Sequence, residues 1–203
     1  MNRPLSLLLG VVAVVVFSLV GLVVLPSWQY GSPTARLIED DAGATVSYPR
    51  LLDELEQRGR HLYRAEGCLY CHSQQVRPEG FGSDIERGLG SRRSVPLDYV
   101  YQAPPLLGTM RTGPDLSNIA SRQPSASWHH LHLYDARIVS PGSIMPPFRY
   151  FYDVTQIDPG AAGYALPQDY FGHNAWIVPN EDGRALLAYI EALHQDHPLE
   201  KVQ

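Results

Sequence analysis

The stretch "GCLYCHSQQVRP" at residues 67–78 places Cys68 and Cys71 three positions apart, with His72 directly after the second cysteine. The chain has 203 residues and no other cysteine, so it has no second pair for a structural disulfide or an all-cysteine zinc site. Two cysteines at this spacing occur in redox dithiols, in zinc sites and in the covalent attachment of a c-type haem. The segments around the motif decide between these chemistries.

The surroundings of the motif favour haem attachment. A redox dithiol opens a helix, whose N-terminus lowers the thiol pKa. Here apolar residues at helical spacing predict a helix over residues 50–66 that ends at Gly67, before the cysteines. A zinc site needs two further ligands, and the histidines that could supply them, His129, His130 and His132, are remote and not at a common zinc spacing.

We therefore predict one haem c, bonded covalently through Cys68 and Cys71, with His72 as a ligand to the iron. A methionine is a frequent second ligand in electron carriers. Met145 lies 73 residues after His72 in "PGSIMPPF", where a glycine and prolines stiffen the loop, and it is the predicted second ligand. Met110, in "LLGTMRTGPDL", is a weaker alternative.

Other residues are candidates for contacts with the haem. His129 and His132 lie three apart on a predicted helix; either is an alternative iron ligand, although packing or a hydrogen bond to a haem propionate is the favoured interpretation. A metal-bound histidine normally donates its other ring N–H to an acceptor, and the carbonyl of Pro114 in "RTGPDL" is a candidate for this role. Arg111 is predicted to pair with a propionate, or else to be an ordinary solvated charge.

The N-terminus predicts a membrane anchor. Residues 5–25 form an uncharged apolar run of 21 residues, long enough to span about 30 Å of hydrocarbon. A cleaved signal peptide is the alternative, but the run is too long and no clear cleavage site follows. Arg3, the only charge before the run, favours a cytoplasmic N-terminus and a periplasmic remainder at a bacterial inner membrane. We expect an anchor over 1–30, a tether over 31–49 and a cytochrome domain over 50–203.

The rest of the chain predicts a mainly α fold with long loops. Helices are expected at 50–66, around 125–135, and after a capping Asn180, whereas residues 146–179 are irregular and aromatic, with little strand signal. Two terminal helices give little apolar core, and a haem would fill the middle. The net charge of −5 argues against a nucleic-acid partner.

These features resemble a known fold and a known family. The haem motif, "GPDL", a methionine followed by proline and the helix "ALLAYIEAL" resemble a class I cytochrome c, in which the first and last helices cross. Gly59 with Tyr63, and Leu186 with Tyr189, have the spacings of that crossing. In order, "GCLYCHSQQVRP", "RTGPDL", "WHHLHL" and "MP" behind one anchor resemble the membrane-anchored mono-haem cytochrome c subunit of cbb(3)-type haem-copper oxidases.

The resemblance implies a subunit without catalytic residues of its own. It would take electrons from a soluble or sister cytochrome c and pass them to the haem b of a catalytic haem-copper subunit, which reduces oxygen and pumps protons; the anchor would contact lipid. The cytochrome c subunit of a nitric oxide reductase and a free-standing tethered shuttle are the alternatives. From its aromatic composition, we also expect the loop 148–176 to be a docking surface.

Overall fold

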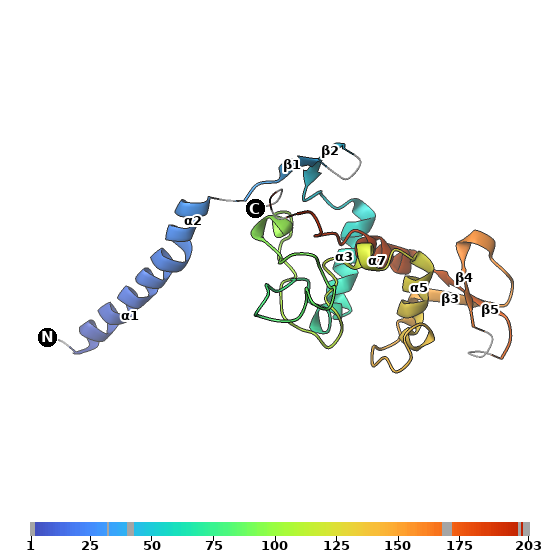
Figure 1. The fold of residues 1–203 in the computed structure, drawn as a ribbon. Helices are drawn as coiled ribbons and strands as arrows, with labels where there is room; N and C mark the ends of the chain where they lie inside the picture. Colours follow the sequence, from blue (N-terminus) through green and yellow to red (C-terminus); the bar gives the residue numbers. More distant parts are fainter. Residues whose placement is uncertain (1–2, 32, 40–42, 168–171, 199, 201–203) are drawn as a thin grey trace.

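The computed structural model describes residues 3–31, 33–39, 43–167, 172–198 and 200. At the N-terminus α1 (Arg3–Leu19), the π-helical turn η1 (Val20–Val24) and α2 (Leu25–Tyr30) form one continuous rod that projects from the rest of the chain (Figure 1). Within the described part of the chain, Arg3–Gln29 is the one helix long and apolar enough to cross a membrane, and none of it is buried. It ends where Gly31 adopts a positive φ of 66°.

The soluble part contains short elements joined by long loops. In chain order these are β1 (Arg36–Glu39), β2 (Thr45–Tyr48), α3 (Glu54–Ala65), η2 (Cys68–Tyr70), η3 (Pro96–Tyr99), α4 (Ile119–Arg122), α5 (Ala126–Tyr134), η4 (Ala136–Ile138), η5 (Arg149–Phe151), β3 (Tyr152–Thr155), η6 (Gly160–Ala162), β4 (Tyr164–Leu166), β5 (Ala175–Pro179) and α7 (Glu181–Glu191). This arrangement confirms the mainly α fold predicted from the sequence.

The first and last helices of the soluble part, α3 and α7, pack against each other. Gly59 allows this close approach, because a Cβ built there would lie 1.9 Å from the carbonyl oxygen of Ala185. One turn later, the rings of Tyr63 and Tyr189 meet edge to face at 5.5 Å. Helix α3 begins four residues later than predicted, because Asp53 forms its capping box.

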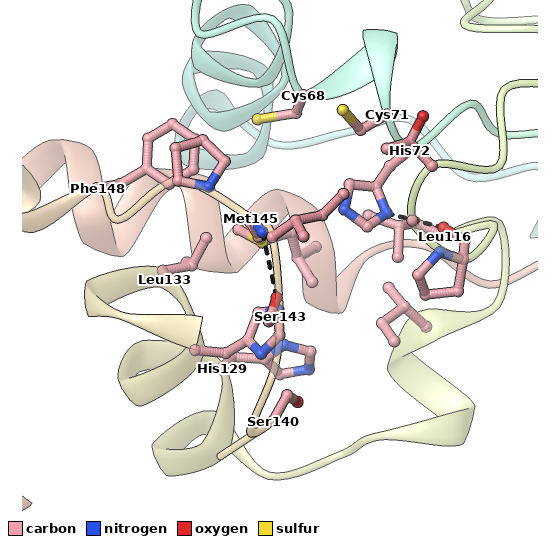
Figure 2. Close-up of a pocket in the computed structure, with 18 of the residues that line it drawn as sticks. Cys68, Cys71, His72, Leu116, His129, Leu133, Ser140, Ser143, Met145 and Phe148 are labelled. Atoms are coloured by element: carbon pink, nitrogen blue, oxygen red, sulfur yellow. Dashed lines mark hydrogen bonds between the residues drawn. The ribbon is translucent and has the colours of Figure 1, made fainter. Parts of the chain in front are cut away.

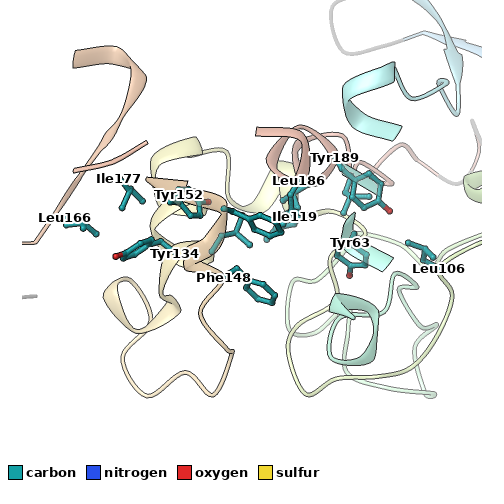
Figure 3. Packing of buried hydrophobic residues seen from close by; sticks show 14 of the residues in the cluster. Tyr63, Leu106, Ile119, Tyr134, Phe148, Tyr152, Leu166, Ile177, Leu186 and Tyr189 are labelled. Atoms are coloured by element: carbon teal, nitrogen blue, oxygen red, sulfur yellow. The ribbon is translucent and has the colours of Figure 1, made fainter. Parts of the chain in front are cut away.

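The main hydrophobic core extends from this helix pair towards α5 and the strands (Figure 3). Leu186 is completely buried beside the pair, and Phe148, Tyr152 and Ile177 continue the core away from it. Tyr134 on α5 meets Tyr152 edge to face at 5.8 Å. The aromatic side chains thus join the two helices to the strand region.

Strands β3, β5 and β4 form an antiparallel sheet in that order, within a region expected to be irregular. Tyr152 pairs with Pro179, and Tyr164 pairs with Ile177. Several aromatic residues of the predicted docking loop face inward: Phe148, Phe151 and Tyr152 are buried. Others in the loop, including Tyr150 and Ile157, remain exposed.

The range expected to be a tether contains a hairpin of β1 and β2. Ile38 and Tyr48 of this hairpin are buried against Val95 and Leu97. The hydroxyl of Tyr48 donates a 2.6 Å hydrogen bond to Asp98, a carboxylate that also pairs with Arg92 at 2.8 Å. The hairpin is therefore fastened to the domain.

Candidate haem-binding site

A cavity of about 720 Å³ opens beside the α3–α7 pair. Its walls are mainly apolar and come from the segment after α3, the loop 112–116, helix α5, the loop 140–146 and helix α7. The four predicted haem-attachment and iron-ligand residues, Cys68, Cys71, His72 and Met145, all line it (Figure 2). Residues far apart in the sequence therefore meet at one site.

The two cysteines reach the cavity because the chain turns sharply after α3. Gly67 adopts a left-handed conformation with φ of 75°, and the short helix η2 follows at once. The backbone N–H of His72 then donates to the carbonyl of Cys68 at 2.8 Å. Both thiols are free, and burial raises the pKa of Cys68 to about 12. A thiol with this pKa stays protonated at neutral pH, whereas the nucleophilic thiol of a redox dithiol has a low pKa.

The ring of His72 is fixed by the loop 113–114. Its Nδ1 lies 2.8 Å from the carbonyl oxygen of Pro114, which can only accept, so Nδ1 carries the proton and Nε2 has a free lone pair. Burial lowers the pKa of His72 and favours the neutral imidazole, the form that binds metals. Gly113 lies against the ring: a Cβ there would come within 2.1 Å of Cε1.

The two methionines considered as second ligands are in different surroundings. Met145 is partly buried, contacts the main core and lines the cavity. Its backbone N–H donates to the hydroxyl of Ser143 at 3.2 Å, which steadies the loop. Met110 is 54% exposed and does not line the cavity. The structure thus brings only Met145 of this pair to the site.

Arg111 does not line the cavity. Its guanidinium forms ion pairs with Asp84 at 2.8 Å and with Asp115 at 3.0 Å. It also donates to the Ser73 hydroxyl at 2.8 Å and to the Gln75 carbonyl at 2.7 Å. These contacts occupy the guanidinium, and the side chain is only 10% exposed, so Arg111 is not an ordinary solvated charge; its contact with a propionate stays a prediction.

Sequence reasoning missed the buried acid at the centre of this cluster. Asp84 is fully buried and also pairs with Arg77 at 2.7 Å. Burial alone would raise the pKa of Asp84, but hydrogen bonds from Arg77 and Arg111 outweigh it and hold that pKa well below its usual range. Asp84 lies in a loop without periodicity, so nothing in the sequence marks it as a partner of two arginines.

The residues after the haem motif tie the site to the rest of the domain. The Gln74 side chain accepts from the hydroxyl of Tyr189 on α7 at 2.9 Å, and its backbone N–H donates to Leu106 at 3.0 Å. The backbone N–H of Gln75 donates to the carboxylate of Asp115 at 2.8 Å, next to the carbonyl that accepts from His72. The segment therefore aligns the loop that orients the imidazole.

The three histidines of α5 have different environments. His129 Nε2 lies 2.7 Å from the carbonyl of Gln123, and His130 Nδ1 lies 3.0 Å from the hydroxyl of Tyr152. His132 lines the cavity, and its buried Nδ1 has no hydrogen-bond partner. Among the described residues there is no group of three or more His, Cys, Asp or Glu side chains that could hold a metal ion.

The crossed helices, the cavity beside them and the residues converging on it define the class: a cytochrome c-like domain behind a long apolar helix. The family model described as cytochrome c oxidase, mono-heme subunit/FixO matches residues 3–162, more than three quarters of the chain. The chain belongs to this family, and is thus a mono-haem subunit of a cytochrome c oxidase. No curated protein gives a significant match.

Proposed function

We propose that this subunit holds its haem covalently through Cys68 and Cys71, with His72 and Met145 as iron ligands, and delivers electrons to the catalytic subunit of the oxidase. The observation that carries the proposal is the convergence of these four residues on one cavity. They come from two segments of the chain separated by more than 70 residues. Haem c attachment requires two free thiols, which form the thioether bonds, and a neutral imidazole, which binds the iron.

The cavity fits the group. Its volume of about 720 Å³ lies within the range of roughly 300–1,000 Å³ typical of cofactor sites. Ile119, Leu133, Phe148 and Leu186 contribute apolar walls suited to a porphyrin face, and they exclude water from the centre of the site. When bound, the haem would supply one-electron chemistry, accepting from a donor cytochrome c and donating to the haem b of the catalytic subunit.

The protein's own residues do the positioning. The Pro114 carbonyl fixes the tautomer and the plane of His72. Gly113 lets its loop approach the ring, and its N–H donates to the Cys71 carbonyl at 3.0 Å. Because the loop is held at several points, the imidazole needs little rearrangement to present Nε2 to the iron. Such rigidity suits an electron carrier, which works best when its ligands move little between redox states.

The anchor sets the proposed location. We infer a single-pass subunit with Arg3 on the cytoplasmic side and the haem domain in the periplasm, where haem c is attached. The partners would be the haem-copper catalytic subunit, beside the anchor, and a further cytochrome c, soluble or sister, as the donor. The exposed residues of 148–176, such as Tyr150 and Ile157, support a docking role for this loop. Replacing the exposed Ile157 by serine should leave the domain folded and weaken assembly or electron entry; unchanged oxidase turnover would contradict that role.

The axial assignment is tested with Met145→Leu in the full-length subunit. The variant should keep its covalent haem, lose the native low-spin spectrum and show a lower reduction potential, because Met/His ligation raises the potential. Met110→Leu is the matched control and should leave both properties unchanged. A native spectrum and potential in Met145→Leu would show that another residue binds the iron.

The function itself is tested by purification in a gentle detergent. Co-purification of a large subunit with haem-copper spectral signals, together with electron transfer from reduced haem c to that subunit, supports the proposal. A partner with non-haem iron would instead indicate a nitric oxide reductase, and isolation of the subunit alone would indicate a free shuttle. Either result would overturn the proposed role.

A further inference from the structure

The cavity has two chemically different ends. Figure 2 shows Cys68 and Cys71 at one end, His72 and Met145 between, and the polar side chains of Ser143, Ser140 and His129 at the end opposite the cysteines. His132 and Trp128 of α5 also line the cavity. Ser143, Ser140 and His129 thus lie on the side away from the attachment point.

This polarity matches the structure of a c-type haem. The substituents that form thioether bonds lie on one side of the porphyrin, and the two propionates lie on the other. Attachment through Cys68 and Cys71 would therefore direct the propionates towards the opposite end of the cavity. A carboxylate in a partly buried place needs hydrogen-bond donors, since it loses its hydration there and is destabilised if it stays unpaired.

Arginine and lysine are absent from the described residues that line the cavity. Arg111, the predicted partner, is bound to Asp84 and Asp115 instead. The carboxylates must therefore find neutral donors or remain in water. This requirement singles out the neutral polar side chains of the cavity wall.

His132 is the side chain best placed for this role. Its Nδ1 is enclosed by protein without a hydrogen-bond partner, so the nitrogen that a ligand in the cavity can reach is Nε2. Its ring stacks on the indole of Trp128, with the centroids 4.5 Å apart and the planes 15° apart, so its orientation is fixed. In the neutral tautomer that carries its proton on Nε2, this fixed ring can donate a hydrogen bond to a carboxylate.

The neighbouring loop offers a second donor. The hydroxyl oxygen of Ser143 already accepts from the N–H of Met145, so its own O–H is available to donate. Since Ser143 also precedes Met145 by only two residues, a hydrogen bond from this hydroxyl would link the propionate end of the cavity to the loop that carries the second ligand.

We propose that His132, held by stacking on Trp128, and Ser143 form a carboxylate-binding subsite for the haem propionates. The subsite works with neutral donors, unlike one built on arginine or lysine. This inference rests on the proposed function, because it requires haem attachment through the two cysteines. It assigns His132 to the edge of the cofactor, not to the iron.

The test uses the full-length subunit with its covalent haem, and begins with the wild type. Covalent haem in the wild type is the condition on which the proposed function depends, and its absence would reject that function before the subsite is tested. The first variant is His132→Phe, which keeps an aromatic ring beside Trp128 and removes the ring nitrogens. The control is His130→Phe, which changes a buried histidine of the same helix that does not line the cavity.

With the hydrogen bond gone, the propionate charge is less compensated and stabilises the oxidised iron. His132→Phe should therefore keep the low-spin spectrum and lower the reduction equilibrium constant about threefold or more, or roughly 28 mV for a one-electron couple. Redox-difference infrared spectra should show shifted propionate carboxylate bands. His130→Phe should lower the stability of the protein without changing the potential or those bands.

Two results would overturn the subsite. An unchanged potential with unchanged carboxylate bands would show that His132 does not contact the propionates, and loss of the low-spin spectrum would make His132 an iron ligand. If His132→Phe does not yield holo-protein, Ser143→Ala replaces it: shifted propionate carboxylate bands with a native low-spin spectrum support the subsite, and unchanged bands reject it.

Discussion

Replacing Gly59 by alanine should separate α3 from α7. A Cβ at this position would lie 1.9 Å from the carbonyl oxygen of Ala185 and 2.7 Å from the Cβ of Tyr189. Ordinary contacts begin near 3.4 Å, so the helices would have to move apart by more than 1 Å. The atom that is struck belongs to the backbone, so no change of rotamer can relieve the clash.

Two opposing terms set the size of the effect. Overpacking a tight interface costs about 1–3 kcal/mol, and a clash with backbone belongs at the upper end. Alanine is better than glycine within a helix by about 1 kcal/mol. The net expected loss is therefore about 2 kcal/mol, or about 30-fold in the ratio of folded to unfolded protein.

The assay is urea unfolding of the detergent-solubilised holo-subunit, followed by haem absorbance and circular dichroism. Gly59→Ala should lower the unfolding midpoint, and His61→Ala, an exposed change on the same helix, should leave it nearly unchanged. A midpoint for Gly59→Ala equal to or above that of the wild type would show that helix propensity dominates and that the close approach is not required.

Three further outcomes follow from the contacts described above. Arg111→Ala should lower the free energy of unfolding by about 3 kcal/mol, measured by urea titration, because the buried carboxylate of Asp84 loses one of its two arginine partners. Burial lowers the pKa of His130 from 6.5 to about 4, so the unfolded chain binds more protons between these values. The free energy of unfolding should therefore fall as the pH decreases from 6.5 to 4, by up to about 1.4 kcal/mol per pH unit, and less steeply in His130→Phe. Gly113→Ala should displace the ring of His72 and reduce the low-spin fraction in the absorption spectrum, whereas a native spectrum would contradict the tight approach.

Local sequence signals predicted the helices and the cluster of candidate ligands. The cap of α7, Asn180, lies where the sequence placed it, because an N-cap depends on only a few neighbouring residues. The spacing of Gly59 and Tyr63 likewise marked the helix crossing. The predicted acceptor for His72, the Pro114 carbonyl, lies within hydrogen-bond distance of the ring.

Such local signals could not predict contacts between loops that are distant in the sequence. The ion pair of Arg111 with Asp84 was not predicted, because Asp84 lies 27 residues earlier in an irregular segment. The strands β3 to β5 were missed for a related reason: they are three to five residues long, and their pairing depends on tertiary contacts with α5 and the core.

The β1–β2 hairpin determines how far the haem domain can travel. A free chain between Tyr30 and Arg50 would extend to about 70 Å, enough for the domain to swing between separate partners. Because the hairpin is fastened to the domain, only the link from Tyr30 to Arg36 remains, with a reach of about 20 Å. The domain therefore stays close to the end of its anchor. A partner that exchanges electrons with it must come to this position, because the short link does not let the domain move between distant partners.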